Sequence, residues 1–498
     1  MPAETAEVLI IGAGPAGLTA AYELAKAGVR STVFEKDGMV GGLARTVAYK
    51  GCLFDIGGHR FFTKVELIER MWREVLGNDL LLRPRLSRIY FRSKFYKYPL
   101  EPLDVLAQLG FWELLRCTAS YVKAQLFQRR PEENMAIWIR NRFGDRLYRT
   151  FFKTYTEKVW GMPCDQIKAD WAAQRIRGLT LSSAIRDALS RHRSPGKARH
   201  RTLTRQFLYP RRGPGMMWTR VQELVESYGS EVHLNAPVER IFWEPGRVNA
   251  VCVGGRRRTG SHFISSLPIR TLIRSLDPAA PPAVRRCADD FAYRDFLIVA
   301  LILKGSNLFP DNWVYIHDPH VRVGRIQNYS NWSPEMTPDS SISGLGLEYF
   351  CSKGDSLWSM RDEELIALAR KELHDIGLVG EPNVLDATVI RVPKAYPVYN
   401  ATYGRGLSVV RDFLSTVPNL QLVGRNGQHR YNNQDHSMLV GLLAARNVLG
   451  ARFNLWDLNT DQEFLEDGVP VTDEQLFGME ASQPQVPAMV QTDLSAGA

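Results

Sequence analysis

Residues 7–28, "EVLIIGAGPAGLTAAYELAKAG", decide the fold class of this chain. A short apolar stretch leads into a glycine-rich turn and then into a segment rich in alanine and leucine, which predicts a strand, a tight turn and a helix. Residues 31–37, "STVFEKD", predict a second strand, so the two segments start a βαβ unit. In the GxGxxG order of Gly12, Gly14 and Gly17, the first glycine permits the turn, the second admits a pyrophosphate, and the third lets the helix pack closely.

The cofactor that this turn predicts is a dinucleotide, held at the N-terminus of the helix. Glu35 lies 18 residues after Gly17, at the end of the second predicted strand, where a carboxylate accepts hydrogen bonds from ribose hydroxyls. Residues 41–62, "GGLARTVAYKGCLFDIGGHRFF", carry two further glycine doublets and a histidine. They resemble FAD proteins of the glutathione-reductase type, in which such loops lie against the pyrophosphate and the flavin ring. No second GxGxxG is present, so the sequence predicts FAD and no dedicated NAD(P) domain.

The length and composition limit the number of domains and the kinds of partner that this chain can have. A chain of 498 residues predicts two or three domains, and a net charge of +10 favours anionic partners. Six cysteines without a CxxC spacing predict a reduced, cytoplasmic protein with neither a disulfide framework nor a metal site. No apolar run is long enough for a transmembrane helix, and the N-terminus lacks the basic region of a signal peptide. Nucleic-acid binding is not predicted, because no recognition motif accompanies the charge.

The predicted organisation inserts a helical domain and a mostly antiparallel sheet domain into an α/β Rossmann domain. Residues 191–212 hold eight basic residues and no acidic one, which predicts an exposed, mobile loop and leaves open a peripheral contact with an anionic membrane. The predicted ranges are 1–84, 205–280 and 410–455 for the FAD-binding domain, 85–99 and 285–405 for the sheet domain, 100–195 for the helical domain, and 468–498 for a flexible tail.

A more specific resemblance rests on motifs spread over residues 41–447. Over this range the chain resembles the UDP-galactopyranose mutase family, especially its eukaryotic form. The motifs are "YTEKVWG" (155–161) followed by "WAAQR" (171–175), "FLYPRRGPGMMW" (207–218), "NWVYIHDPHVRVGRIQNYSNWSP" (312–334), "KAYPVYN" (394–400) and "GRNGQHRYNNQDHSM" (424–438).

The resemblance implies a substrate, an activity and a set of site residues. Two arginines from separate segments, Arg175 and Arg325, clamp the diphosphate of a nucleotide sugar, whereas Arg322 matches no family position and is predicted to be structural or exposed. The implied catalytic residues are His59, Arg175 and Arg325. The implied substrate-binding residues are Tyr98, Tyr155, Trp160, Tyr315, Asn331, Tyr396 and Tyr431, with core packing as the alternative for Trp160. The implied cofactor-binding residues are Gly12, Gly14, Pro15, Ala16, Gly17, Glu35, Lys36, Gly42, Leu43, Ala44, Arg45, Gly57, Gly58, His59, Gly424, Arg425, Asn433, Gln434, Asp435 and Ser437.

The implied reaction interconverts the pyranose and furanose forms of a nucleoside-diphosphate sugar, as an isomerase without net redox change. It proceeds through an adduct between N5 of reduced FAD and the sugar, with NADPH or NADH as the reductant of the flavin. The oligomeric state stays open.

The sequence departs from the family pattern at one motif. In "YKYPLEPLD", residues 96–104, Leu100 stands where the family has an aromatic residue and Glu101 where it has an amide that reads uracil. A glutamate accepts hydrogen bonds but does not donate them, so the base, the sugar or both can differ. The main alternative is an FAD-dependent oxidoreductase of the amine oxidase or protoporphyrinogen oxidase type, and a further one is a non-catalytic flavoprotein scaffold.

Overall fold

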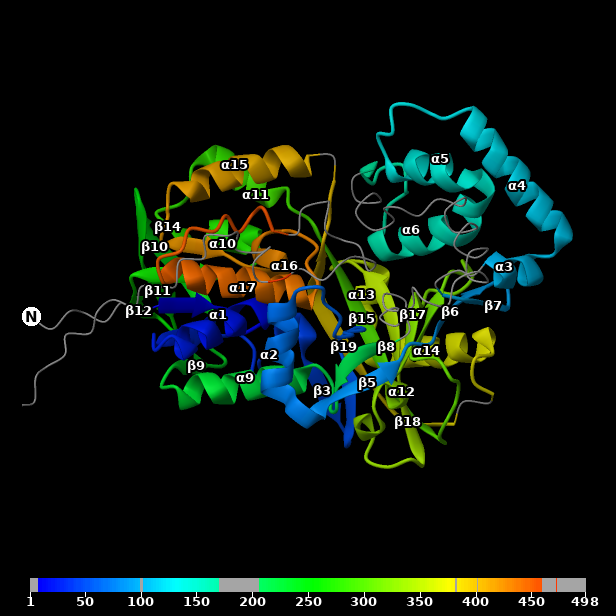
Figure 1. Ribbon diagram of the computed structural model, residues 1–498, viewed down its shortest axis with the longest axis horizontal. Helices are drawn as coiled ribbons and strands as arrows, with labels where there is room; N and C mark the ends of the chain where they lie inside the picture. Colours follow the sequence, from blue (N-terminus) through cyan, green and yellow to red (C-terminus); the bar gives the residue numbers. More distant parts are fainter. Residues whose placement is uncertain are drawn as a thin grey trace, which may run out of the picture.

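The computed structural model describes residues 8–98, 102–169, 206–380, 383–400, 402–458 and 472 of the chain. These residues form two large sheets of different character and a group of helices at one edge (Figure 1). A parallel sheet with its helices occupies one half of the molecule, and a long antiparallel sheet occupies the other half. The predicted fold class, an α/β Rossmann domain with a helical region and a mostly antiparallel sheet, is confirmed.

The parallel sheet has five strands in the order β20-β13-β1-β2-β9, and its central strand β1 is buried on both faces. Val8 and Ile10 pack against helices on one face, whereas Leu9 and Ile11 pack into a separate core on the other. Such a continuous apolar strand is typical of a parallel sheet covered on both sides. The strands are β1 (Val8–Ile11), β2 (Ser31–Phe34), β9 (Glu231–His233), β13 (His262–Ser265) and β20 (Leu420–Leu422).

Different elements cover the two faces of this sheet. The first face carries α1 (Pro15–Lys26), α2 (Glu66–Leu76), α9 (Gly215–Ser227) and α17 (Gln434–Val448). The second face carries α10 (Ile269–Ser275), α11 (Pro282–Asp289), α15 (Tyr403–Ser415) and a small sheet in the order β12-β11-β10-β14. Its strands are β10 (Val238–Glu244), β11 (Arg247–Val253), β12 (Arg256–Thr259) and β14 (Leu276–Asp277).

Helix α1 approaches its neighbours at distances that only glycine permits. A Cβ added to Gly17 would lie 2.0 Å from the carbonyl oxygen of Gly12, and one added to Gly441 of α17 would lie 2.1 Å from that of Ala16. Both distances are far below van der Waals contact. The two glycines therefore set how closely α1 packs on the turn after β1 and on α17, as the spacing of Gly12 and Gly17 predicted.

The second large sheet has seven strands in the order β19-β15-β18-β17-β16-β6-β7. Every neighbouring pair is antiparallel except β16 and β6, which are parallel. Helix α14 (Asp362–Ile376) packs on one face, and the hairpin of β3 (Thr46–Tyr49) and β4 (Cys52–Asp55) contributes to the core on the other. The strands are β6 (Ser87–Phe91), β7 (Lys94–Lys97), β15 (Tyr293–Lys304), β16 (Trp313–Ile316), β17 (Arg325–Asn328), β18 (Ile342–Cys351) and β19 (Val384–Pro397).

The helical region lies beside the antiparallel sheet and reaches the outer edge of the molecule (Figure 1). It comprises α3 (Pro102–Leu109), α4 (Phe111–Leu126), α5 (Met135–Leu147), a π-helical turn η3 (Tyr148–Lys153) and α6 (Thr154–Trp160). Gly144 in α5 has a positive φ of 81°, and a Cβ there would lie 2.8 Å from the backbone nitrogen of Tyr121, so α4 and α5 pack closely at this point. No helix among the described residues has both the length and the hydropathy that crossing a bilayer requires.

The prediction of an exposed loop over residues 191–212 is wrong for residues 206–210, which form a strand. Arg211 and Arg212 lie in the turn after it, where Arg212 is exposed, and residues 191–205 lie outside the described part. Strand β8 (Gln206–Pro210) pairs with β5 (Leu80–Pro84), and its Phe207 and Tyr209 are buried. The alternation of apolar residues outweighs the neighbouring charges, and Arg211 beyond the strand pairs with Asp79, Nε to Oδ1, at 2.8 Å.

The remaining short elements connect these layers, and the predicted domain boundaries stay predictions. They are η1 (Gly42–Ala44), η2 (Gly77–Asp79), α12 (Tyr329–Trp332), η5 (Pro334–Met336), α13 (Ser356–Ser359) and α16 (Gly424–Gly427).

We expect Gly441→Ala to destabilise the protein by about 1–3 kcal/mol, because the new methyl group forces α17 away from α1. Urea unfolding measures this. Gly404→Ala is the matched control, since no atom lies within 4 Å of its added Cβ, and it should be neutral or slightly stabilising. Equal stabilities of the two variants would contradict the close approach.

Candidate functional site

The predicted dinucleotide cradle lies at the carboxyl end of β1. Gly12 has a φ of +101°, which favours glycine, and a Cβ there would lie 2.1 Å from Oγ of Ser266. Gly14 is the N-cap of α1 with Pro15 after it, and no side chain caps this helix end. The first backbone N–H groups of α1 therefore stay available to an anion, which the helix dipole also favours.

Glu35 is held at the end of β2 by two backbone bonds. Its carboxylate accepts from the N–H of Ala13 at 2.8 Å and from the N–H of Asp37 at 3.0 Å, and the residue is buried. These bonds orient the carboxylate beside the first glycine turn. Contact with a ribose stays a prediction.

A second glycine loop lies directly against the first. The N–H of Gly41 donates to the carbonyl of Ala13 at 2.8 Å, and a Cβ on Gly42 would lie 3.1 Å from Cα of Gly14. Arg45, which the sequence assigned to the cofactor, forms an ion pair with Asp37 at 2.6 Å, Nη1 to Oδ2. Bare backbone thus faces bare backbone at the edge of the cradle, as close approach to a pyrophosphate requires.

The N-terminus of α17 adds a buried polar group that the fold leaves unused. Both amide atoms of Gln434 are buried, and neither has a hydrogen-bond partner among the described residues. Buried polar atoms in folded proteins are nearly always paired, so this amide is available to a ligand. Arg425 nearby donates from Nε to the carbonyl of Asn432 and from Nη1 to that of Ala395, both at 2.9 Å. These features fit a dinucleotide cofactor.

The other predicted cofactor residues differ in how exposed they are to solvent. Gly424 has a φ of +76°, and a Cβ there would lie 3.2 Å from Cβ of Ala16. Lys36 and Asn433 are exposed. The buried or half-buried members are Ala16, Leu43, Ala44, Asp435 and Ser437.

His59 stands where the cradle meets the antiparallel sheet. Its Nε2 lies 3.0 Å from the carbonyl oxygen of Ile56, which only accepts, so Nε2 carries a proton. Burial, together with the positive charges of Arg425 and Arg325, lowers the pKa of His59 to about 4. The imidazole is therefore neutral near pH 7. A Cβ on Gly57 would lie 3.5 Å from its Nε2 and 3.8 Å from Nη2 of Arg325, so the predicted flavin loop and the predicted clamp meet here.

Arg325 is fixed by a buried carboxylate that the sequence analysis did not single out. Its Nε and Nη2 donate to one carboxylate oxygen of Glu348 at 2.9 and 2.6 Å, and Glu348 is fully buried. The other oxygen accepts from Nε2 of Gln327 at 3.0 Å. Burial alone would lower the pKa of Arg325, but the carboxylate of Glu348 reverses this effect and raises it. By contrast, Arg322 is exposed, as predicted.

The strand register explains why these side chains meet. Tyr315 of β16 pairs with Arg325 of β17, and Arg325 pairs with Glu348 of β18, so the three residues form one row across neighbouring strands. Side chains of directly opposed residues lie on the same face of a sheet. The row points a phenol, a guanidinium and a carboxylate toward the cradle side, beside Gly57.

Tyrosine rings line the space around Arg325. Tyr155 stands edge-on to Tyr315 with ring centroids 5.4 Å apart, and Tyr396 stacks on Tyr431 at 5.7 Å. Among the described residues, no hydrogen bond involves the hydroxyls of Tyr155, Tyr315 and Tyr396. Burial, followed by the neighbouring Tyr431, raises the pKa of Tyr396 to about 12, so its hydroxyl stays protonated and can donate.

Two arginines that the sequence analysis missed lie beside this cluster. The Cζ atom of Arg85 lies 5.6 Å from the ring of Tyr98 and 5.7 Å from that of Trp313. Burial and then the charge of Arg85 lower the pKa of Arg60 to about 10. The position of Arg60 directly after His59 could have indicated from the sequence that Arg60 lies at the site. Nothing in the sequence around Arg85 indicated this for Arg85. For Glu348 the signal was a charge within the apolar run "GLGLEYF", residues 344–350.

The other predicted substrate residues have mixed surroundings. Tyr98 stands edge-on to Tyr315 at 5.0 Å, and the buried Trp160 stands edge-on to Tyr396 at 6.3 Å. The side-chain amide of Asn331 donates to the carbonyls of Phe309 and Asp311, both at 2.8 Å, so the fold already uses it. Arg175, Leu100 and Glu101 lie outside the described residues. The substrate roles of all these residues stay predictions.

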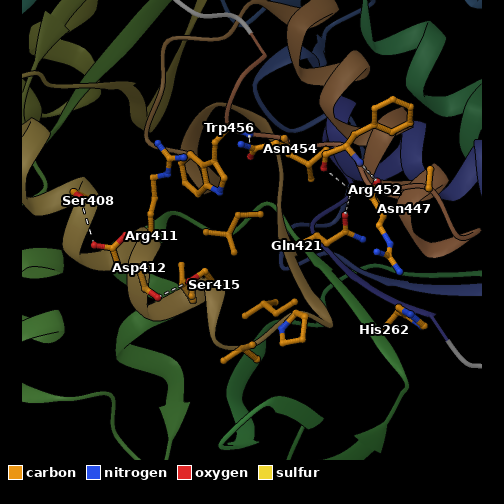
Figure 2. Close-up of a pocket in the computed structure, with 18 residues that line it drawn as sticks. His262, Ser408, Arg411, Asp412, Ser415, Gln421, Asn447, Arg452, Asn454 and Trp456 are labelled. Atoms are coloured by element: carbon orange, nitrogen blue, oxygen red, sulfur yellow. Dashed lines mark hydrogen bonds between the residues drawn. The ribbon is translucent and has the colours of Figure 1, made fainter. Parts of the chain in front are cut away.

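A surface pocket of about 730 Å³ lies elsewhere, beside the edge strand β20 of the parallel sheet (Figure 2). It is lined by α15, β20 and residues 451–456, with Arg411 against the ring of Trp456. Asn447 donates to Gln421 at its wall at 2.9 Å. None of the predicted site residues lines it, so the candidate site is the region between the glycine loops and the tyrosines.

Comparison with known proteins gives a family match over most of the chain. The family model "Flavin containing amine oxidoreductase" matches residues 15–449. The "Putative flavin-containing monoamine oxidase AofH" of Mycobacterium tuberculosis is 25% identical over 303 residues, which cover 58% of this chain and 62% of that protein. Coproporphyrinogen III oxidase of Propionibacterium freudenreichii is 21% identical over 459 residues, 82% of this chain and 84% of that protein.

A crystal structure of reduced UDP-galactopyranose mutase has a TM-score of 0.81 against this chain, with 22% identity over 94% of this chain and 98% of the mutase. At that identity the likeness shows a shared fold.

We expect a double-mutant cycle to reveal strong coupling between Arg325 and Glu348. Arg325→Met leaves a buried carboxylate unpaired, which costs about 3–5 kcal/mol of unfolding free energy. Adding Glu348→Gln should recover at least about 2 kcal/mol, because the unpaired charge is then removed. Arg322→Met is the exposed control and should change stability by less than about 0.5 kcal/mol. Additive effects in urea unfolding would show that the pair is not coupled.

We expect His59 to make the protein less stable in acid. Between pH 6.5 and about 4 the unfolded chain binds a proton at this residue and the folded chain does not, so the stability that neutral His59 contributes is lost as the pH falls through this window. The difference in unfolding free energy, wild type minus His59→Gln, should fall by up to about 3 kcal/mol as the pH is lowered from 6.5 to about 4. Parallel pH profiles of the two proteins would refute a neutral, half-buried imidazole.

Proposed function

We propose that this chain, which belongs to the flavin-containing amine oxidoreductases, is a flavin-dependent mutase of a nucleoside-diphosphate sugar. FAD is the cofactor of this flavoenzyme. The glycine loops and Gln434 would hold its phosphates and ring, and Glu35 would accept from its ribose. The proposed reaction interconverts the pyranose and furanose forms of the sugar and leaves the flavin in its starting redox state.

The observation that carries this proposal is the half-buried guanidinium of Arg325 beside Gly57 and His59, with Tyr155, Tyr315 and Tyr396 close enough to affect its charge. Burial strengthens its attraction for an anion. Arg60, Arg85 and Arg425 lie around the same site, so a cationic amine would meet repulsion, whereas a diphosphate would meet charge-assisted donors. This arrangement favours an anionic substrate over the amine substrates of amine oxidases.

Each protein group has a distinct proposed role. Arg325, which Glu348 holds in one orientation, would bind the diphosphate and stabilise its charge when it leaves the sugar. Tyr396 and Tyr431 would donate hydrogen bonds to phosphate oxygens and exclude water. Arg175 is the proposed second clamp by resemblance.

The cofactor supplies the chemistry of the sugar itself. Reduced FAD, when bound, supplies a nucleophilic nitrogen that can displace the diphosphate at the anomeric carbon. His59, neutral and fixed through Nε2, would orient a sugar hydroxyl or the ring of the cofactor, and NADPH or NADH is the proposed reductant.

A second candidate is oxidation of an anionic organic substrate. The similarity to coproporphyrinogen III oxidase over 82% of this chain favours it, and the same arginines would bind carboxylates. The two candidates differ in redox balance, because an oxidase consumes an acceptor at each turnover and a mutase does not.

The test uses dithionite-reduced protein and a panel of nucleoside-diphosphate furanoses, with products separated by chromatography. We expect pyranose to form without oxygen uptake. Oxygen consumption with an oxidised product, or no conversion of any member of the panel, would contradict the mutase.

Arg325→Lys then tests the role of the clamp. Lysine preserves the ion pair with Glu348 but lacks the planar fork, so turnover should fall by roughly thirtyfold, or about 2 kcal/mol. Arg322→Lys is the matched control and should retain wild-type turnover.

A further inference from the structure

Helix α4 presents a row of large apolar side chains to solvent. Soluble domains seldom expose such rows without a partner. In Figure 1 this helix forms the outer edge of the molecule, on the side away from α1 and α9. The exposed fractions are 67% for Phe111, 75% for Trp112, 44% for Leu115, 48% for Val122 and 72% for Leu126.

These residues fall on one face of the helix, here called the outer face of α4. With about 100° of rotation per residue, Phe111, Leu115, Val122 and Leu126 lie within a sector of about 60°, and Trp112 widens it to about 100°. The opposite side of α4 packs on α5. There Cys117 is 4% exposed, and the backbone at Tyr121 lies against Gly144. The outer face is therefore not the side that α4 uses in the core.

The two exposed charged residues of α4, Arg116 and Lys123, are both basic. Arg116 lies 3.7 Å from the carboxylate of Glu113, Nη1 to Oε2, but is still 69% exposed, and Lys123 is exposed on the same flank. Beyond the helix, the exposed Arg129 and Arg130 precede Glu132 and Glu133. The one acidic residue of α4, Glu113, has its carboxylate bound by Arg146 at 2.8 Å and is only 17% exposed. An apolar face with a basic flank and no exposed acid is typical of a helix that lies in a membrane interface.

We propose that the outer face of α4 docks this protein on an anionic phospholipid bilayer, with the helix lying flat in the headgroup region. A helix of 16 residues, which is about 24 Å long, presents its aromatic and aliphatic side chains to the acyl boundary, and Arg116 and Lys123 bind lipid phosphates. A second copy of the chain fits less well, since pairing two outer faces brings basic flanks together without carboxylates to neutralise them. The glycine loops lie on other elements, so docking leaves the cofactor site unobstructed.

Flotation of the full-length holoprotein with vesicles tests the proposal. One set contains phosphatidylcholine alone, and the other contains roughly two parts phosphatidylcholine to one part phosphatidylglycerol. The protein should float with the anionic vesicles and less with the neutral ones, and added salt should weaken the binding. Replacing Phe111, Trp112 and Leu126 by serine should lower partitioning by about tenfold or more, because binding scales with buried apolar area.

The matched control replaces three exposed apolar residues on other elements, Leu82, Tyr228 and Leu385, by serine, and should float as wild type does. Flavin absorbance and thermal unfolding show that both triple variants remain folded. Wild type that fails to float with either vesicle set, or equal flotation of both triple variants, would overturn the proposal. So would a wild-type dimer in solution that only the α4 variant converts to a monomer.

Discussion

The ion pair between Arg325 and the buried Glu348 is the interaction on which the proposed substrate site depends. Glu348 is fully buried in the middle of the antiparallel sheet and also accepts from Gln327. A buried carboxylate with that many donors is stable only while its cation stays in place. The guanidinium is therefore held in one orientation before any ligand arrives, which reduces the entropy that binding would otherwise cost. Its charge also contributes to keeping His59 neutral.

The second constraint is the absence of side chains along the glycine loops. Gly14 and Gly42 bring backbone against backbone and Gly12 makes room for the side chain of Ser266, while Gly17 and Gly441 let α1 lie close to its neighbours. The parallel sheet thereby presents N–H groups and a helix N-terminus to a cofactor, and the antiparallel sheet carries the charged row that we propose for a substrate. The site lies where the two meet, because Gly57 and Gly58 at the end of β4 approach Arg325 and Gln327. An anionic substrate and a flavin are thus proposed to share one boundary between two sheets.

Local patterns in the sequence predicted the parts of this account that depend on short-range chemistry. The spacing of Gly12, Gly14 and Gly17 predicted the turn and the helix after it, and the different environments of Arg322 and Arg325 were anticipated. The importance of Glu348 was not, because its partner is 23 residues away and the pairing depends on strand register, which composition does not encode. Basic residues led to the wrong prediction for residues 206–210, where alternating apolar residues decide the structure instead.

Tertiary packing also determined what the helical region leaves exposed. The aromatic residues of α4 predicted a helix, but which face meets α5 and which meets solvent depends on contacts such as that of Gly144 with Tyr121. Arg60 and Arg85 likewise join the site only through the fold. The sequence shows that these residues are charged but not where they lie. Their partial burial beside tyrosines strengthens the attraction that their charge exerts on an anion.

The central claim is that the site binds a diphosphate. Calorimetric titration of the reduced holoprotein with the common nucleoside diphosphates and with the matching nucleosides tests it most directly. The account predicts that at least one diphosphate binds with an affinity that falls with salt, and that its nucleoside binds far more weakly. Equal affinity for the nucleoside and its diphosphate, or no binding of any diphosphate, would contradict it.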